Sequence, residues 1–256
     1  NYVVEKVLVR RLNIISVKLK NNQISPLDAI KEFRNNPFVD KAILDTKVSR
    51  RDMPDDMQFD QQWALHNVGQ SGGTEDADID APEAWDIATG GITPLGDTIV
   101  VAIVDGGMLL THADLTPNLW TNWGEIPGNG IDDDNNGYVD DVHGWDAYSS
   151  DGSVPSDGHG THVAGIVGAK GNNGVYVAGV NWNVKLMPIA GSSGTTSIVL
   201  EAYGYALDQR AIYDSTDGSS GAFVVATNSS FGVNNADCNS GNYSLWNDMY
   251  DALGQY

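Results

Sequence analysis

Apolar residues along this chain form short runs, and the segments between the runs have helical spacing. The runs at 98–107, 184–190 and 222–230 are mostly apolar, which is typical of strands buried on both faces of a parallel sheet. The segments 81–88, 159–170 and 197–211 have the apolar spacing of helices. Strands that alternate with helices predict an α/β fold, with a parallel sheet flanked by helices on both faces.

The first part of the chain has a different pattern. Residues 14–20 alternate as in a strand, and Ser25 and Pro26 open a segment with helical spacing. Strand character returns at 38–39 and 41–51, so we predict a small β-α-β module, α+β in class. Proline and acidic residues at 52–58 mark a boundary. Two domains are therefore expected, 1–55 and 56–256.

Charge divides the chain at nearly the same place. Residues 1–51 carry a net charge of +6 and residues 52–256 carry −26, which gives the total of −20. Opposite charges favour docking of one part on the other, and the alternative is an acidic domain with an ordinary basic leader. The acidic part argues against a nucleic-acid partner, because phosphate would repel it.

No apolar run has the length of a membrane span, and no signal peptide is recognisable. The lone Cys238 excludes an internal disulfide and a thiolate metal cluster.

Two residues have a placement that suits catalysis. Asp105 ends an apolar run and precedes two glycines, and ligands in parallel α/β sheets bind at the carboxyl ends of the strands. His159 begins a helix between two glycines, where other backbone can approach its ring closely. A neutral histidine oriented by a carboxylate can act as a general base. The alternative for Asp105 is a capping role, and His162 is expected to be a buried core residue.

The strings VVAIVDGG and HGTHVAG, followed by VKLMPIA and NSSFG, resemble the subtilisin-like serine proteases, the subtilases, from about residue 56 onward. The resemblance implies a serine endopeptidase that cleaves polypeptides with a Ser/His/Asp triad, in which Asp105 orients His159 as the general base. A peptide would bind as an extended strand between two edges of the cleft. The resemblance implies that Ser230, Phe231 and Gly232 form one edge, at the primary specificity pocket, and that Ser193 and Gly194 form the opposite edge.

Three departures from the family pattern bear on this expectation. Gly106 stands where the family usually has Ser or Thr. The oxyanion asparagine and the nucleophilic serine, in a Gly-Thr-Ser-like string, are not found and are expected beyond Tyr256. The sheet is then incomplete at its C-terminus, and the fragment alone is inactive. The alternatives are a catalytically dead, calcium-stabilised homologue that binds peptides, and an acidic calcium-binding extracellular module.

The family resemblance also gives the basic leader a role. Its pattern resembles the later part of an inhibitory propeptide, which assists folding and blocks the cleft until it is removed. The resemblance implies cleavage near residues 51–56, a secreted extracellular enzyme, and a monomer once the protein is complete.

A metal site is predicted independently, in the acidic loop at 128–141. Oxygen-bearing residues alternate around a glycine as in an EF-hand calcium loop, but position 12 is His143 instead of Glu. The expected calcium ligands are Asp132, Asp134, Asn136, the Tyr138 carbonyl and Asp140. Asp141 or a more distant residue would replace the missing bidentate ligand, and the alternative is a solvated acidic turn.

A second calcium site is implied by the resemblance alone. Asp114 matches a calcium ligand of the family, and Asn172 or Asn173 lies in the loop that supplies others. Asp56 is a further candidate ligand from the start of the second domain.

Overall fold

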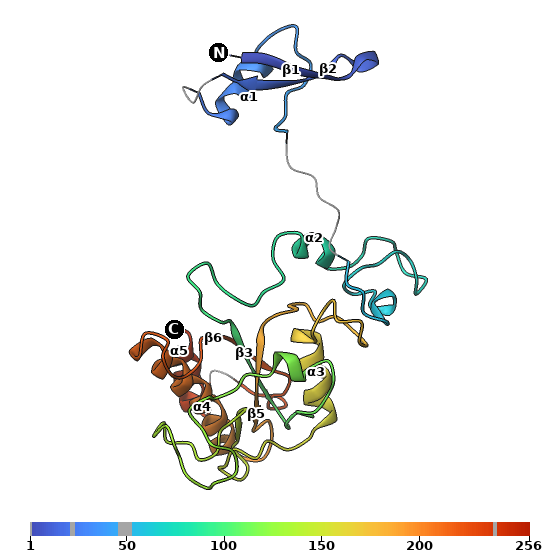
Figure 1. The fold of residues 1–256 in the computed structure, drawn as a ribbon. Coiled ribbons are helices and arrows are strands. Elements are labelled where there is room, and N and C mark those ends of the chain that lie inside the picture. Colours follow the sequence, from blue (N-terminus) through green and yellow to red (C-terminus); the bar gives the residue numbers. More distant parts are fainter. Residues whose placement is uncertain (1, 21–23, 46–52, 238–239) are drawn as a thin grey trace. The chain divides into compact units, whose positions relative to one another are not determined.

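The computed structural model describes residues 2–20, 24–45, 53–237 and 240–256. The chain divides into two compact units, Asn1–Arg50 and Arg51–Tyr256 (Figure 1). Cys238, part of the expected cleavage segment near 51–56 and part of the expected strand at 41–51 lie outside the described residues.

The first unit is a two-stranded antiparallel sheet with one helix. Strand β1 (Tyr2–Val9) pairs with β2 (Ile14–Leu19), and α1 (Pro26–Arg34) follows. Ser25 caps the helix by accepting a hydrogen bond from the Asp28 backbone N–H at 3.1 Å. Pro26 then occupies the first helical turn, where no N–H is needed, so the helix begins where the sequence predicts.

The predicted β-α-β order of this unit is wrong over its described part, because the order is β-β-α. Tyr2–Val9 is a strand although its apolar residues are clustered instead of alternating. No strand forms at 38–45, and Ile43 there is 81% exposed. A strand requires a hydrogen-bonding partner, and β2 pairs with β1. Alternation alone does not reveal which segments will pair.

The second unit contains a four-stranded parallel sheet in the order β4-β5-β3-β6. The strands are β4 (Trp145–Asp146), β5 (Lys185–Ala190), β3 (Val100–Asp105) and β6 (Val224–Ser229). Asp105 is level with Ala190 of β5, and Val104 is level with Ser229 of β6. The carboxyl ends of the three neighbouring strands β5, β3 and β6 therefore meet at one edge.

Helices cover both faces of this sheet, as predicted. Helix α4 (Thr196–Ser215) packs on the face that carries Val100, Ala102 and Val104. Helix α3 (Gly158–Gly168) packs on the other face, against Ile103 and the neighbouring strand β5. Side chains alternate between the two faces of a strand, so one apolar run supplies both cores. Burial of each large side chain contributes about 1.5–3 kcal/mol.

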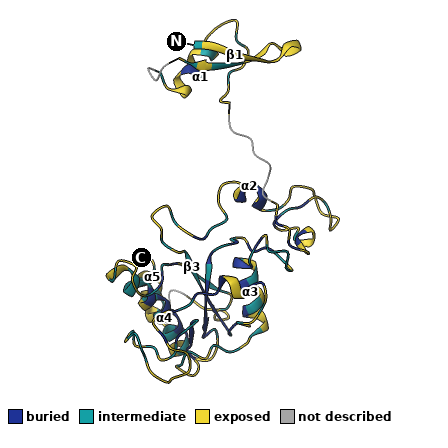
Figure 2. Cartoon of the chain, viewed as in Figure 1, coloured by how far each residue is buried: buried dark blue, intermediate teal, exposed yellow. Residues whose placement is uncertain are grey.

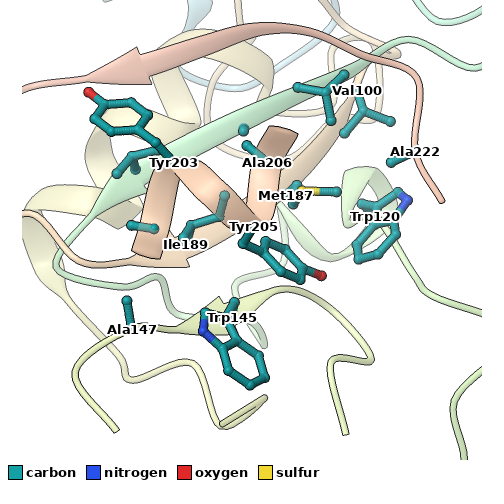
Figure 3. Packing of buried hydrophobic residues seen from close by; sticks show 14 of the residues in the cluster. Val100, Trp120, Trp145, Ala147, Met187, Ile189, Tyr203, Tyr205, Ala206 and Ala222 are labelled. Carbon is teal, nitrogen blue, oxygen red and sulfur yellow. The ribbon is translucent and has the colours of Figure 1, made fainter. Parts of the chain in front are cut away.

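The α4 face holds the aromatic core of the unit (Figure 3). Tyr203 and Tyr205 are fully buried, and the ring of Tyr205 stacks on that of Trp145 at a centroid distance of 6.0 Å. The β3 ribbon is mostly buried, whereas β1 in the first unit is mostly exposed (Figure 2). The apolar run of β3 is thus the structural centre of its unit.

The remaining elements are short. They are α2 (Ala81–Trp85), α5 (Ser244–Leu253), and the 3-10 turns Arg10–Leu12, Phe59–Gln61 and Thr116–Asn118. The helix expected at 81–88 ends at Trp85, which packs with Phe59 and Trp182 in a small separate core. No described helix combines the length and the apolar character that crossing a membrane requires.

Candidate active site

Asp105 is the last residue of β3 and lies at the carboxyl edge of the sheet. Its side chain is buried, with 4% of the residue exposed, and Oδ1 accepts a hydrogen bond from the Gly106 backbone N–H at 2.7 Å. The Gly191 backbone N–H, just beyond β5, donates to the Asp105 carbonyl at 2.9 Å. The strand end and its neighbour therefore fix this carboxylate in place.

The imidazole of His159 faces this carboxylate. Its Nδ1 lies 2.9 Å from each carboxylate oxygen of Asp105. This hydrogen bond, together with the charge of Asp105, raises the pKa of His159 above its ordinary value. With Nδ1 as the donor, Nε2 is the basic nitrogen, and the side chain is 60% exposed. No described serine hydroxyl hydrogen bonds to His159.

The start of α3 brings the histidine this close. Asp157 caps the helix by accepting from the Gly160 backbone N–H at 2.7 Å. A Cβ atom at Gly160 would lie 2.1 Å from the Gly107 carbonyl oxygen and 3.0 Å from the Cβ of Asp105. Only glycine at 160 lets the first turn of the helix lie against the end of β3.

Asp157 is a site residue that the sequence analysis missed. A Cβ atom at Gly106 would lie 3.0 Å from the carboxyl carbon of Asp157. The glycine that departs from the family pattern therefore leaves room for this acid. Asp157 also raises the pKa of His159, by a smaller amount than Asp105 does. A helix-capping acid two residues before a histidine is the sequence signal that could have identified it.

The expected substrate segments lie on either side of Asp105 in the strand order. Ser193 and Gly194 follow the end of β5, and both are exposed. Ser230 follows β6 directly, and its hydroxyl lies 3.4 Å from the side-chain nitrogen of Asn228. Gly232 is exposed, whereas Phe231 is half-buried and packs near Tyr203. Because β3 lies between β5 and β6, the two segments follow the strands on either side of Asp105.

The expectation that His162 is a buried core residue is wrong, because it is exposed. Gly160, Ala164 and Gly168 are the buried positions of α3. They recur every four residues and form one face of the helix, whereas His162 lies about 200° around the axis from Gly160. The buried face is set by the small residues and not by the distance from His159.

A second group of carboxylates is formed by the acidic loop at 128–141 together with Glu125, which precedes it. Oxygens of Glu125, Asp132 and Asp134 lie within 4.8 Å of one another. Glu125 is buried and accepts hydrogen bonds from the backbone N–H groups of Asp133, Asp134 and Asp140. The sequence analysis missed Glu125, because it precedes the repeating part of the loop.

The other expected ligands of this loop have different contacts. Asp140 accepts from the backbone N–H groups of Asn129 and Gly130, at 3.1 and 2.9 Å. The side-chain oxygen of Asn136 accepts from the Tyr138 N–H at 2.7 Å, and the Tyr138 hydroxyl donates to Asp208. The described carboxylates that converge are therefore Glu125, Asp132 and Asp134.

Asp141 anchors the acidic loop to helix α4. It is completely buried and accepts hydrogen bonds from four neutral side chains, those of Asn122, Asn136, Tyr205 and Gln209. Burial raises the pKa of Asp141 to about 6, although its hydrogen bonds act in the opposite direction. One of these donors bonds to Oδ1 of Asp141 and three bond to Oδ2.

The second expected calcium site has a different environment. Asp114 is fully buried and accepts from the Asn173 side chain at 3.1 Å and from the Val177 N–H at 3.0 Å. Asp56 accepts from the Asn172 N–H at 2.7 Å, and its Oδ1 is buried without a hydrogen-bond partner in the structure. Burial raises the pKa of Asp56, and the charge of Asp114 adds to this rise. An unpaired buried carboxylate oxygen fits a cation ligand.

The fold and the Asp105–His159 geometry define a class, α/β proteins with a hydrogen-bonded Asp–His pair at the carboxyl edge of a parallel sheet. A profile described as the subtilase family matches residues 96–252, more than half of the chain. The chain belongs to the subtilase family.

Individual proteins of the family match this chain over only part of its length. The chain is 42% identical over 93 residues to Subtilisin-like protease 1 of Plasmodium berghei, covering 36% of this chain and 16% of that protein. It is 32% identical over 171 residues to an extracellular protease of Xanthomonas campestris pv. campestris, covering 62% and 26%. The chain thus spans about a quarter or less of these two relatives.

Solved structures agree on the fold. The Aeromonas sobria serine protease, solved in complex with its chaperone ORF2, superposes with a TM-score of 0.55 at 21% identity. The match covers 80% of this chain and 30% of that one. At this identity the likeness supports the fold alone.

Proposed function

We propose that this chain is part of a serine endopeptidase that hydrolyses peptide bonds in polypeptides. The observation that carries the proposal is the Asp105–His159 pair, with Nδ1 held by the carboxylate and the ring exposed. The family supplies the reaction class, and the nucleophilic serine comes from outside these 256 residues.

The roles follow from the geometry. Asp105 holds the Nδ1–H tautomer of His159, so Nε2 takes the proton from the serine hydroxyl as the oxygen attacks the peptide carbonyl carbon. The imidazolium then gives that proton to the amine nitrogen as the C–N bond breaks, which leaves an acyl-enzyme. Water attacks the ester carbon, His159 accepts the proton of this water, and the serine is regenerated. Asp105 stabilises the imidazolium in both steps.

The substrate would lie between the two strand-end segments. An extended peptide adds to sheet edges through backbone hydrogen bonds, and alternate side chains occupy pockets. Ser193 and Gly194 would form one edge, and Ser230, Phe231 and Gly232 the other. The placement of the segments on the two sides of β3 supports this arrangement.

The basic first unit would act as an inhibitory propeptide, the domains being 1–55 and 56–256. The charge of +6 on residues 1–51 against −26 on residues 52–256 supports electrostatic docking. Secretion fits the name of the extracellular protease that matches this chain.

Calcium is the proposed cofactor, with a stabilising role. Hard carboxylate and carbonyl oxygens are the ligands that Ca²⁺ prefers. Glu125, Asp132 and Asp134 would hold one ion, with Asn136, the Tyr138 carbonyl and Asp140 as further candidates. Asp56 and Asp114 would hold a second, which would satisfy the unpaired Oδ1 of Asp56. A bound ion would offset repulsion between these carboxylates and thereby stabilise the fold.

The activity is tested on the complete gene product. We expect it to cleave a fluorogenic peptide, to be labelled by a serine-directed phosphonate, and to lose cleavage in His159→Ala. The reading frame should continue into a Gly-Thr-Ser-like string. Peptide binding without labelling or cleavage would instead identify a catalytically dead homologue.

The calcium proposal is tested by thermal unfolding with calcium and after chelation. Calcium at about 100 times its Kd adds about 2.7 kcal/mol per site to the unfolding free energy. Glu125→Gln and Asp114→Asn should each reduce the calcium-dependent rise in Tm. Asp60→Asn is the matched control. It also replaces one carboxylate with an amide, but Asp60 is exposed and belongs to neither cluster. The same calcium effect in all three variants would contradict both sites.

A further inference from the structure

Tyr148 lies beside the Ser193 edge. It follows β4 by two residues, and Ser192 and Ser193 follow β5, the parallel neighbour of β4. Asp146 of β4 is level with Ala190 of β5, so the segments after both strands leave the sheet at the same edge. The Tyr148 hydroxyl lies 3.1 Å from the Ser193 hydroxyl and 3.4 Å from that of Ser192.

A short turn, residues 146–151, fixes Tyr148 in this position. Asp146 and Asp151 exchange backbone hydrogen bonds, at 2.8 and 3.3 Å, and the Tyr148 N–H donates to the buried Asp146 carboxylate at 2.9 Å. The turn is tied to α4 as well, because Ser150 and Trp145 both donate to Glu201. These contacts fix the backbone that carries Tyr148, which preorganises the position of this residue for binding.

The cluster of three hydroxyls, from Tyr148, Ser192 and Ser193, is accessible to a ligand. Tyr148 is 38% exposed, and Ser193 is exposed. Each of the three hydroxyls can donate or accept a hydrogen bond. A cluster of this kind recognises a polar side chain by pairing with it and discriminates against an apolar isostere.

We infer that Tyr148, with Ser192 and Ser193, forms a specificity subsite for a hydrogen-bonding side chain of the bound peptide. The inference rests on the proposed function, because that function places the peptide along Ser193 and Gly194. The Tyr148 hydroxyl forms a hydrogen bond with the substrate side chain that faces the Ser193 edge. At that position of the peptide it favours threonine over the isosteric valine.

The test uses the complete gene product and pairs of peptides that differ only by Thr or Val. The pairs cover each of the four positions before the scissile bond. At one position we expect kcat/KM to be about 3- to 10-fold higher with Thr than with Val, which corresponds to one hydrogen bond. The difference should lie mainly in KM. Tyr148→Phe should abolish this preference, whereas Tyr176→Phe should keep it. Tyr176 is the matched control, because its hydroxyl has no hydrogen-bond partner among the described residues and it is 46% exposed.

A binding measurement separates this inference from the proposed function. Fluorescence anisotropy gives the Kd of the same peptides for His159→Ala with and without Tyr148→Phe. A Thr preference in Kd that Tyr148→Phe removes supports the subsite even if the protein cleaves nothing. Equal affinity for Thr and Val at all four positions, or a preference that survives in Tyr148→Phe, overturns it. The absence of both cleavage and binding overturns both proposals.

Discussion

Asp105 and Asp141 are two buried aspartates of the same unit, but their carboxylates have different kinds of hydrogen-bond partner. Asp105 is 4% exposed and directs its carboxylate at His159, a titratable and exposed partner. Asp141 is completely buried and directs its carboxylate at four neutral donors. Burial is therefore a poor guide to the role of a carboxylate. The partner decides whether its charge can act on a reaction.

The energetic consequences differ accordingly. A buried carboxylate is stable only when hydrogen bonds replace its hydration, and Asp141 receives these bonds from Asn136 of the acidic loop and from Tyr205 and Gln209 of α4. Its charge thus joins two segments that are far apart in the sequence. Asp105 instead raises the basicity of a group that solvent and substrate can reach. The comparison predicts that one aspartate governs activity and the other stability.

Asp105→Asn should produce the largest effect on activity. An amide can donate to Nδ1, so it favours the wrong imidazole tautomer and cannot stabilise the imidazolium. We expect kcat/KM of the complete gene product to fall on the order of 10⁴-fold, as measured with a fluorogenic peptide.

The melting temperature of Asp105→Asn is its control. The shape of the side chain is retained, and the amide oxygen can still accept from the Gly106 N–H, so we expect Tm to remain close to that of the wild type. A large loss of Tm with a small loss of activity would reverse the roles assigned to the two aspartates.

Asp141→Ala should lower stability. The substitution leaves the donors of Tyr205 and Gln209 buried without an acceptor, at about 1–3 kcal/mol for each. We expect the unfolding free energy from urea titration to fall by about 3 kcal/mol or more. Tyr138→Phe is a milder variant of the same region, because it removes one hydrogen bond from an exposed pair. Equal stability losses in the two variants would contradict the anchoring role of Asp141.

The sequence predicted the part of the molecule whose pattern is strongest. The strands around Val104 and Ile189 are continuous apolar runs between glycine-containing turns, and His159 opens a helix with a capping Asp157 before it. Local pattern and tertiary burial agree in these segments, so the fold class and the Asp–His pair could be predicted. Spacing alone does not pair the two side chains, because 54 residues separate them, and the family resemblance was the signal that linked them.

The parts that could not be predicted depend on partners far along the chain. β1 is a strand because β2 pairs with it, whereas residues 38–45 form no strand. Glu125 joins the acidic loop from outside its repeating part, and Tyr148 meets Ser193 only because β4 and β5 are neighbours. No spacing rule within a short window includes such contacts. The rotation of α3, which exposes His162, is likewise set by how small residues fit the sheet.

The pH dependence of cleavage should show the smallest effect and gives the most specific test of the Asp105–His159 pair. His159 acts as a base only when it is neutral, so kcat/KM should fall as the pH drops below its pKa. Asp105 raises this pKa, and Asp157 raises it less. Replacing either acid with Asn removes a negative charge that stabilises the imidazolium. The acidic limb of the pH profile should therefore move to lower pH in both variants, and further in Asp105→Asn. Asn at 157 keeps the helix cap, so a shift there reports charge and not unfolding. A limb that moves to higher pH in either variant would mean that the carboxylates do not set the basicity of His159.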